Sequence, residues 1–212
     1  QANAIGKGRA RGAKMVVVDP RPTALARQAD VWLRVRPGTD AALALGLIHL
    51  MISSGRFDEG FVRDWTNGPL LVRSDNGLFL REQDLWPHAE SNRFLAWSDE
   101  RGCVVPYDTE QAAQPQLSEH FRLQGAVPVE AQGAPGLVCH PAFGLLAEAC
   151  ALYGPQEVER ITGVPEASLH AAADLFGTLG RVAYHAWTGI GQHANATQSE
   201  RAVATLYALG GS

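Results

Sequence analysis

Residues 16–40, with the sequence VVVDPRPTALARQADVWLRVRPGTD, decide the fold that we predict for this chain. The run Met15–Val18 is rich in β-branched residues, is too short for a helix and is interrupted by Asp19-Pro20, which predicts a buried strand of the parallel type. The second run, Val31–Val35, stops before Pro37-Gly38 and leads directly into a strongly apolar helix. The stretch therefore predicts two neighbouring strands of an α/β sheet.

Each of these predicted strands is followed by a turn that carries a carboxylate. Asp19 and Arg21 follow the first strand, whereas Thr39 and Asp40 follow the second. In open α/β sheets, ligands bind beyond the carboxyl ends of the strands. We therefore expect these four residues to lie along one ligand-binding edge.

The composition is that of an ordinary globular protein, with 46% hydrophobic and 19% charged residues among 212. Lys and Arg number 18 and Asp and Glu 22, a formal net charge of −4, which disfavours nucleic acid or an anionic membrane as partner. No run approaches the roughly 18 apolar residues of a membrane span, so we expect no membrane insertion. Cys103, Cys139 and Cys150 lack CxxC spacing, which disfavours a disulfide framework, a zinc site or an iron–sulfur site within this chain.

The chain is expected to form a three-layer α/β fold, with a mostly parallel, Rossmann-like sheet and helices on both faces. Residues 1–68 would form one α/β part, with a helix from the N-cap Thr39 to about Ser53 and a second helix over Asp58–Trp65. Residues 69–140 contain short alternating runs separated by Gly, Pro, Asp and Asn, which predicts an insertion rich in β-hairpins.

Residues 141–212 are expected to complete the α/β domain. Three helices come first, at 141–153, 156–162 and 165–177, with Gly163 as the C-cap of the second. A strand over residues 181–186 and a loop with two glycines follow, and then a helix over 198–209 with a capping box of Thr197 and Glu200.

The two carboxylates have alternative interpretations. Asp19, at a strand end, suits the hydroxyls of a ribose, and Asp40, at a helix start, suits the paired N1 and N2 donors of a guanine. Equally, Asp19 can open an Asp-Pro turn, and Asp40 can favour the helix dipole. Arg21, between two prolines, can clamp a phosphate or remain a solvent-exposed side chain.

The segment Thr188-Gly-Ile-Gly-Gln-His193 is the second candidate site. Gly189 and Gly191, between a predicted strand and helix, permit close approach of a ligand to the backbone amides. Gln192 can donate and accept hydrogen bonds in one plane, which suits a heterocycle such as a pterin. His185 and His193 lie near this segment but have no HExxH-type partner, so we expect no metal site built from side chains.

Together, the segments Val16–Ile52, Phe57–Thr66 and Trp187–Ser212 resemble the molybdopterin-dependent oxidoreductases of the dimethyl sulfoxide reductase and formate dehydrogenase type. This resemblance implies a molybdenum or tungsten ion bound by two molybdopterin guanine dinucleotides in the full-length enzyme. It implies contacts to the guanosine and phosphate end of one cofactor from Asp19, Pro20, Arg21, Pro22, Thr23, Gly38, Thr39 and Asp40. It also implies that Thr188 and Gln192 approach the pterin.

The chain also departs from this family pattern. The cysteine cluster for an iron–sulfur centre, the region that supplies the metal ligand and the C-terminal domain do not occur in these 212 residues. We therefore expect a central fragment of a larger catalytic polypeptide, with an iron–sulfur cluster upstream and no catalytic residue or activity of its own. Its expected partners are the remaining domains, electron-transfer subunits and a small-molecule substrate, in a bacterial cytoplasm or periplasm.

Two other functions remain open. The first is a nicotinamide-type Rossmann dehydrogenase domain with Asp19 as the ribose-binding acid, which would need a glycine-rich turn about 20 residues before Asp19. The second is a non-catalytic interaction module whose working surface is the β-rich insertion.

Overall fold

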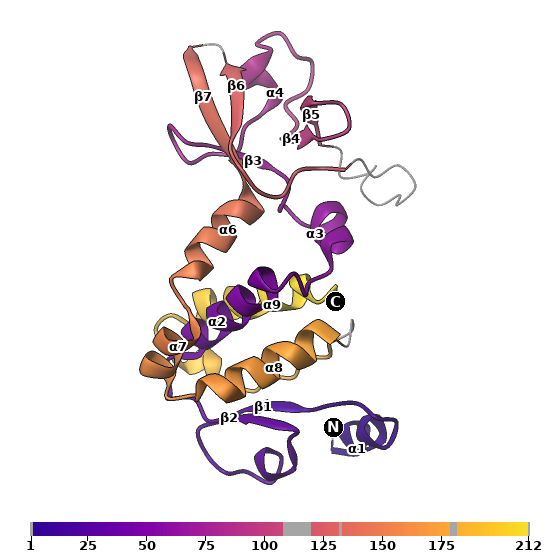
Figure 1. The fold of residues 1–212 in the computed structure, drawn as a ribbon, viewed down its shortest axis with the longest axis vertical. Coiled ribbons are helices and arrows are strands. Elements are labelled where there is room, and N and C mark those ends of the chain that lie inside the picture. Colours follow the sequence, from indigo (N-terminus) through magenta and orange to yellow (C-terminus); the bar gives the residue numbers. More distant parts are fainter. Residues whose placement is uncertain (1, 108–119, 132, 179–181, 212) are drawn as a thin grey trace. The chain divides into compact units, whose positions relative to one another are not determined.

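The computed structural model describes residues 2–107, 120–131, 133–178 and 182–211, and Figure 1 shows their ribbon. The chain divides into two compact units. Unit 1 comprises residues 1–57 and 150–212, and unit 2 comprises residues 58–149. Helices and strands occur in both units, so the predicted mixed α/β class is confirmed.

Unit 1 contains the two strands predicted from residues 16–40. The strands β1 (Val16–Val18) and β2 (Val31–Leu33) pair in parallel, with Val16 opposite Val31 and Val18 opposite Leu33. A short 3-10 helix, η1 (Ala26–Gln28), lies in the connection between them. Both strands therefore end at the same edge, as predicted.

The predicted burial of the first strand is wrong in part. Val16 and Val17 are only half-buried, and Val18 is 46% exposed. Among the described residues β1 pairs with β2 alone, so its outer side has no strand to cover it.

Helices form the remainder of unit 1. The helix α2 (Asp40–Ser53) packs against α7 (Pro155–Thr162), α8 (Glu166–Thr178) and α9 (Ala196–Leu209), and β2 packs against α8 (Figure 1). The chain begins with α1 (Ala2–Ala10), and the short η3 (Ile190–Gln192) precedes α9. The fully buried side chains of this unit include Leu33, Ile48, Val158 and Leu169.

Two glycines shape this group of helices, one by allowing close packing and one by ending a helix. Gly46 of α2 lies so near Val158 of α7 that a Cβ atom at Gly46 would overlap the Val158 side chain. Gly163 ends α7 in the left-handed conformation, with φ of +74°, and its amide donates to the carbonyl of Glu159. The predicted C-cap at Gly163 is therefore confirmed.

Unit 2 is built from short strands and helices. In chain order these are α3 (Glu59–Trp65), β3 (Leu71–Arg73), α4 (Glu82–Leu85), β4 (Leu95–Ser98), β5 (Cys103–Pro106), β6 (Val127–Ala131), β7 (Ala134–Pro141) and most of α6 (Ala142–Ala151). The strands form an antiparallel sheet of order β3-β7-β6 and an antiparallel pair β4-β5. Buried and exposed residues alternate along β6, because one face of its sheet covers a core that includes Leu71, Leu80 and Leu95.

Three details differ from the predictions. Parallel pairing within the described ranges is confined to β1 and β2, so a mostly parallel sheet is not confirmed. Residues 182–186 form no strand, because the described chain places no strand beside them to receive their backbone hydrogen bonds; residue 181 lies outside the described residues. The capping box is wrong, because α9 begins at Ala196, Asn195 is its N-cap, and Thr197 therefore lies inside the helix.

Within the described ranges, no helix has the length and apolar character needed to cross a membrane.

Candidate functional site

The turn after β1 holds Asp19 at the strand end. The amide of Asp19 donates to the carbonyl of Leu33 on β2, and the Trp32 indole donates to the carbonyl of Asp19 at 2.8 Å. One carboxylate oxygen of Asp19 accepts the Arg21 amide at 2.8 Å, which is the turn-opening role expected of an aspartate before proline. The second carboxylate oxygen accepts no hydrogen bond from any residue that the structure describes.

The Thr23 side chain takes part in a local hydrogen bond, whereas the Arg21 side chain is exposed. The Thr23 hydroxyl accepts the Ala26 amide at 3.2 Å, and so it helps to start η1. The Arg21 side chain is exposed and forms no ion pair within the described ranges. Arg34, at the end of β2, donates to the carbonyl of Pro20 at 3.3 Å, which brings a second guanidinium to this turn.

The turn after β2 is anchored to α7 by Arg36. The Arg36 amide donates to the carbonyl of Thr162 at 2.8 Å, and its guanidinium donates to the carbonyls of Arg160 and Ile161 at 2.7 and 3.1 Å. These carbonyls end α7 and would otherwise lack partners. Arg36 is therefore a structural residue that fixes the position of the turn.

Gly38 and Thr39 carry the chain from this anchor into α2. Gly38 has a φ of +85°, a left-handed conformation that side chains rarely adopt. Thr39 is the N-cap residue, as predicted, but its hydroxyl donates to the carbonyl of Arg36 at 2.7 Å and does not cap the helix amides. The predicted N-cap residue and the predicted start of α2 are therefore confirmed, although the Thr39 side chain makes no capping hydrogen bond.

Asp40 is the first residue of α2 and is half-buried. Its carboxylate forms no hydrogen bond or ion pair with any described residue. A negative charge at this position is stabilised by the helix dipole. The carboxylate thus has a fixed backbone and both of its oxygens free to accept hydrogen bonds.

The segment 188–193 lies beside this turn. A Cβ atom at Gly38 would be 3.5 Å from Nδ1 of His193, so the two segments that the sequence singled out meet at this point. Gly189 and Gly191 face open space, and neither has a positive φ. The segment forms η3, in which the amide of Gln192 donates to the carbonyl of Gly189.

These hydrogen bonds leave fewer backbone amides of the loop free for a ligand than we predicted. The amides of Gln192 and His193 are used within the turn, whereas Thr188, Gly189, Gly191 and the Gln192 side chain remain exposed. A ligand can therefore approach the exposed side chains and the two glycines, but it cannot bind every amide of the loop.

Tyr184 is a functional candidate that the sequence analysis missed. Its hydroxyl donates to Oε2 of Glu200 in α9 at 3.3 Å, and its ring lies 5.1 Å from that of Tyr207. Burial raises the pKa of Tyr184 to about 12, and the negative charges of Glu200 and Asp40 act on it in the same direction. The signal that could have identified it is the position of a tyrosine in the apolar run that precedes the glycine loop.

Metal-binding side chains do not gather anywhere in the described residues: no group of three His, Cys, Asp or Glu is placed to hold an ion. Cys103 is exposed, whereas Cys139 and Cys150 are buried. Burial raises the pKa of both buried thiols to about 11, so they stay protonated at neutral pH.

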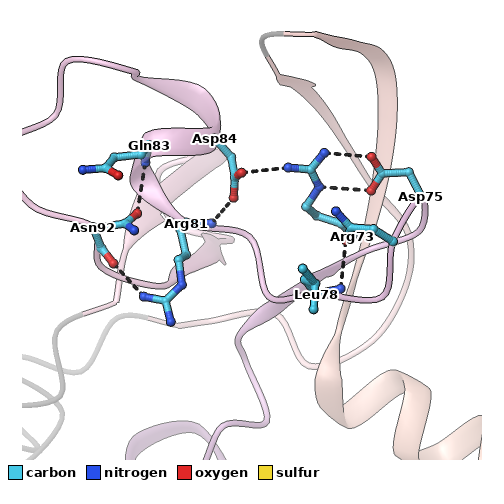
Figure 2. A network of polar contacts seen from close by, with 8 residues as sticks. Arg73, Asp75, Leu78, Arg81, Gln83, Asp84 and Asn92 are labelled. Carbon is cyan, nitrogen blue, oxygen red and sulfur yellow. Dashed lines mark hydrogen bonds and ion pairs between the residues drawn. The ribbon is translucent and has the colours of Figure 1, made fainter.

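The charged side chains of unit 2 form a contrasting arrangement, shown in Figure 2. The Arg73 guanidinium donates to both carboxylate oxygens of Asp75 at 2.7 and 3.0 Å, and to Asp84 at 2.8 Å. Asp84 also accepts the Arg81 amide, and the Arg81 guanidinium donates to the carbonyl of Asn92. These groups bind one another across β3 and α4, which is a structural role.

Residues 2–209 match the molybdopterin oxidoreductase family. The chain belongs to this family. The match covers both turns, the glycine segment and the whole of unit 2. It therefore favours a molybdopterin ligand over the nicotinamide cofactor of a Rossmann dehydrogenase.

Individual relatives agree with this membership. The chain is 32% identical over 202 residues to the catalytic chain of a candidate dimethyl sulfoxide reductase of Halobacterium salinarum, and 27% identical over 203 residues to the alpha chain of the dimethylsulfide dehydrogenase of Rhodovulum sulfidophilum. Each alignment covers 94% of this chain but only 23% and 22% of the relative. The chain thus spans less than a quarter of the length of these relatives.

A solved structure shares the fold. The acetylene hydratase from Pelobacter acetylenicus superposes with a TM-score of 0.61 at 23% identity, covering 100% of this chain and 19% of the hydratase. The mixed α/β arrangement of the described residues therefore also occurs in part of this hydratase.

Proposed function

We propose that this chain holds the nucleotide end of a molybdopterin guanine dinucleotide within a larger molybdenum or tungsten oxidoreductase. The observation that carries the proposal is the pair of parallel strands β1 and β2, whose common edge leads to a half-buried carboxylate, Asp40, with no partner in the described chain. Family membership supplies the class of cofactor.

The acceptor groups of the site fit a guanine. Guanine presents two parallel N–H donors, at N1 and N2, and an ionised carboxylate with two free oxygens can accept both. Asp40 has this property, and its backbone is fixed by α2 on one side and by the Arg36 anchor on the other. Gly38 and Thr39 would lie against the same base.

The turn after β1 fits a ribose and a phosphate. Asp19 has one carboxylate oxygen free for a ribose hydroxyl, since only the other accepts the Arg21 amide. The guanidiniums of Arg21 and Arg34 lie on the same turn and are exposed, which suits the negative charge of a pyrophosphate. Pro20, Pro22 and Thr23 would fix the course of the chain around it.

The pterin would lie toward the segment 188–193. Thr188, Gly189, Gly191 and the Gln192 side chain are exposed there, and the two glycines leave room for a flat ring system. When bound, the cofactor and its metal supply the two-electron chemistry, and the residues of this chain bind and orient it. No residue of this chain is assigned a catalytic role.

This chain would form only one part of the full-length enzyme. We propose that residues 1–68 and 141–212 form the cofactor-binding α/β part of the full-length protein, with residues 69–140 as an insertion. In the full-length protein, the strands β1 and β2 would join a larger parallel, Rossmann-like sheet. The second guanine dinucleotide, the metal ligand and an upstream iron–sulfur cluster would come from its other parts, and electron-transfer subunits and a small-molecule substrate would be its partners.

Elemental and base analysis of the full-length protein tests this function. Purified anaerobically, it should contain molybdenum or tungsten, and acid hydrolysis should release two guanines per metal ion. A preparation with neither metal, or with a metal but no guanine, would contradict the proposal. The Asp40→Asn variant should retain less guanine than an Arg11→Gln control, which alters an exposed side chain that lies outside both turns.

A further inference from the structure

The corner between the starts of α2 and α9 offers hydrogen-bond acceptors. Gly38, two residues before α2, lies near His193, three residues before α9, since a Cβ atom at Gly38 would be 3.5 Å from the His193 ring; the two helices also pack together. Asp40 belongs to the first turn of α2, and Glu200 lies near the start of α9. Tyr184 is bound to Glu200 at this corner, where the charge of Asp40 also acts on it.

The phenol of Tyr184 has a defined role in its hydrogen bond. An ionised carboxylate can only accept, so the Tyr184 hydroxyl donates its single proton to Glu200, at 3.3 Å. The phenol oxygen keeps its lone pairs, which remain available to accept another hydrogen bond. Tyr184 is 46% exposed, which is sufficient for a ligand to reach it.

Guanine has one more N–H than Asp40 can accept. A carboxylate that binds N1–H and one N2–H leaves the second hydrogen of the exocyclic amine without a partner. Hypoxanthine lacks this amine, and adenine presents an acceptor at N1, where guanine presents a donor. A second acceptor beside Asp40 would therefore increase the selectivity for guanine.

We propose that Tyr184 is a specificity-determining residue whose phenol oxygen, fixed by Glu200, accepts the second N2–H of the guanine bound at Asp40. This inference rests on the proposed function and adds the basis on which the site selects the base. Tyr207 holds the Tyr184 ring from the side, and its own hydroxyl forms no hydrogen bond with the described residues. It therefore provides a matched control.

The test is equilibrium binding of GMP and of IMP to the cofactor-free protein, as wild type, Tyr184→Phe, Tyr207→Phe and Asp40→Asn. Loss of one neutral hydrogen bond lowers an affinity roughly 3- to 10-fold. Tyr184→Phe should lower GMP affinity by this factor and leave IMP affinity unchanged within about twofold. Tyr207→Phe should preserve the wild-type ratio of GMP to IMP affinity, and circular dichroism establishes that each variant is folded.

The outcomes separate the two proposals. If the wild type binds neither nucleotide, the proposed function itself fails. If GMP binds and Asp40→Asn weakens it, but Tyr184→Phe leaves the GMP to IMP ratio unchanged, the role of Tyr184 fails and the proposed function stands. An equal loss of selectivity in Tyr207→Phe would also overturn the role of the Tyr184 hydroxyl.

Discussion

Charged side chains have different surroundings in two regions of this protein, the sheet side of unit 2 and the edge of β1 and β2 in unit 1. In unit 2, Arg73 binds Asp75 and Asp84 (Figure 2). The buried Glu82 binds Arg93, so each of these charges has a neighbour of opposite sign. In unit 1, the charges at the edge of β1 and β2 are left without such neighbours.

Asp40 and the Arg21 side chain form no ion pair with any residue in the described ranges, although each sits on a backbone that the fold holds firmly. A paired charge stabilises the fold, whereas a fixed but unpaired charge is available to a ligand. We therefore expect the paired charges of unit 2 to contribute to stability and the unpaired charges of Asp40 and Arg21 to contribute to ligand binding.

The largest effect is expected from Glu82→Ala in unit 2. The Glu82 side chain is 6% exposed and accepts hydrogen bonds from Ser91, from the Arg93 amide and from the Arg93 guanidinium. Its removal should lower the free energy of unfolding by about 3 kcal/mol, somewhat less than for a wholly buried pair because Arg93 is half exposed. Urea denaturation measures this loss. The GMP affinity of the folded variant should not change. A tenfold change would contradict the claim that Glu82 acts on stability alone.

Acid should also lower the free energy of unfolding of the wild type. Hydrogen bonds from Arg93 and Ser91 lower the pKa of Glu82 from 4.5 to about 2. The stabilisation is therefore complete above pH 4.5 and is lost as the pH falls from 4.5 toward 2. Urea denaturation at a series of pH values should show this loss, and Glu82→Ala should lack that part of the pH dependence. If the wild type and Glu82→Ala lost the same free energy of unfolding in acid, the loss would not arise from Glu82 and the prediction would be contradicted.

Asp40→Asn should have the next largest effect, chiefly on binding. A charged hydrogen-bond acceptor contributes about 1.5–3 kcal/mol, so GMP affinity should fall roughly 10- to 150-fold. The free energy of unfolding should fall by less than about 1 kcal/mol, because Asp40 has no partner in the described fold and loses only its interaction with the helix dipole. Calorimetric titration and urea denaturation measure the two quantities. A large loss of stability with unchanged affinity would make Asp40 a structural residue.

Arg21→Gln should have the smallest effect. An exposed guanidinium near a phosphate contributes modestly, so GMP affinity should fall about 3-fold at low salt, and the difference should shrink as salt screens the charge. Titration with GMP at two salt concentrations measures this difference, with Arg11→Gln as the matched exposed control. Equal effects of the two substitutions would show that Arg21 acts only through net charge.

The sequence predicted the features of unit 1 that depend on neighbouring residues. The apolar runs before Asp19 and Arg36 predicted the two paired strands, and Gly163 ends α7 as expected. In unit 2, Asp58 likewise caps α3 by accepting the Phe61 amide at 2.8 Å. These features follow from local backbone preferences, which a single sequence carries.

Features that depend on distant contacts were not predictable. Arg36 binds carbonyls more than 120 residues away, and nothing near it in the sequence indicates α7 as its partner. Tyr184 can donate its hydrogen bond to Glu200 only once α9 is in place, and α9 begins at Ala196, which is too early for Thr197 to be its N-cap. The assignment of Asp19, Arg21, Asp40 and Gln192 to a cofactor stays a prediction.

The most direct test of the central claim is residue-resolved NMR of the protein titrated with GMP. The amides of Thr39 and Asp40 at the start of α2 should shift in a saturable manner, and those of Arg73 and Asp84 in unit 2 should not. Saturable shifts confined to unit 2, or a spectrum unchanged by millimolar GMP, would contradict the claim that the unpaired charges of unit 1 hold a guanine nucleotide.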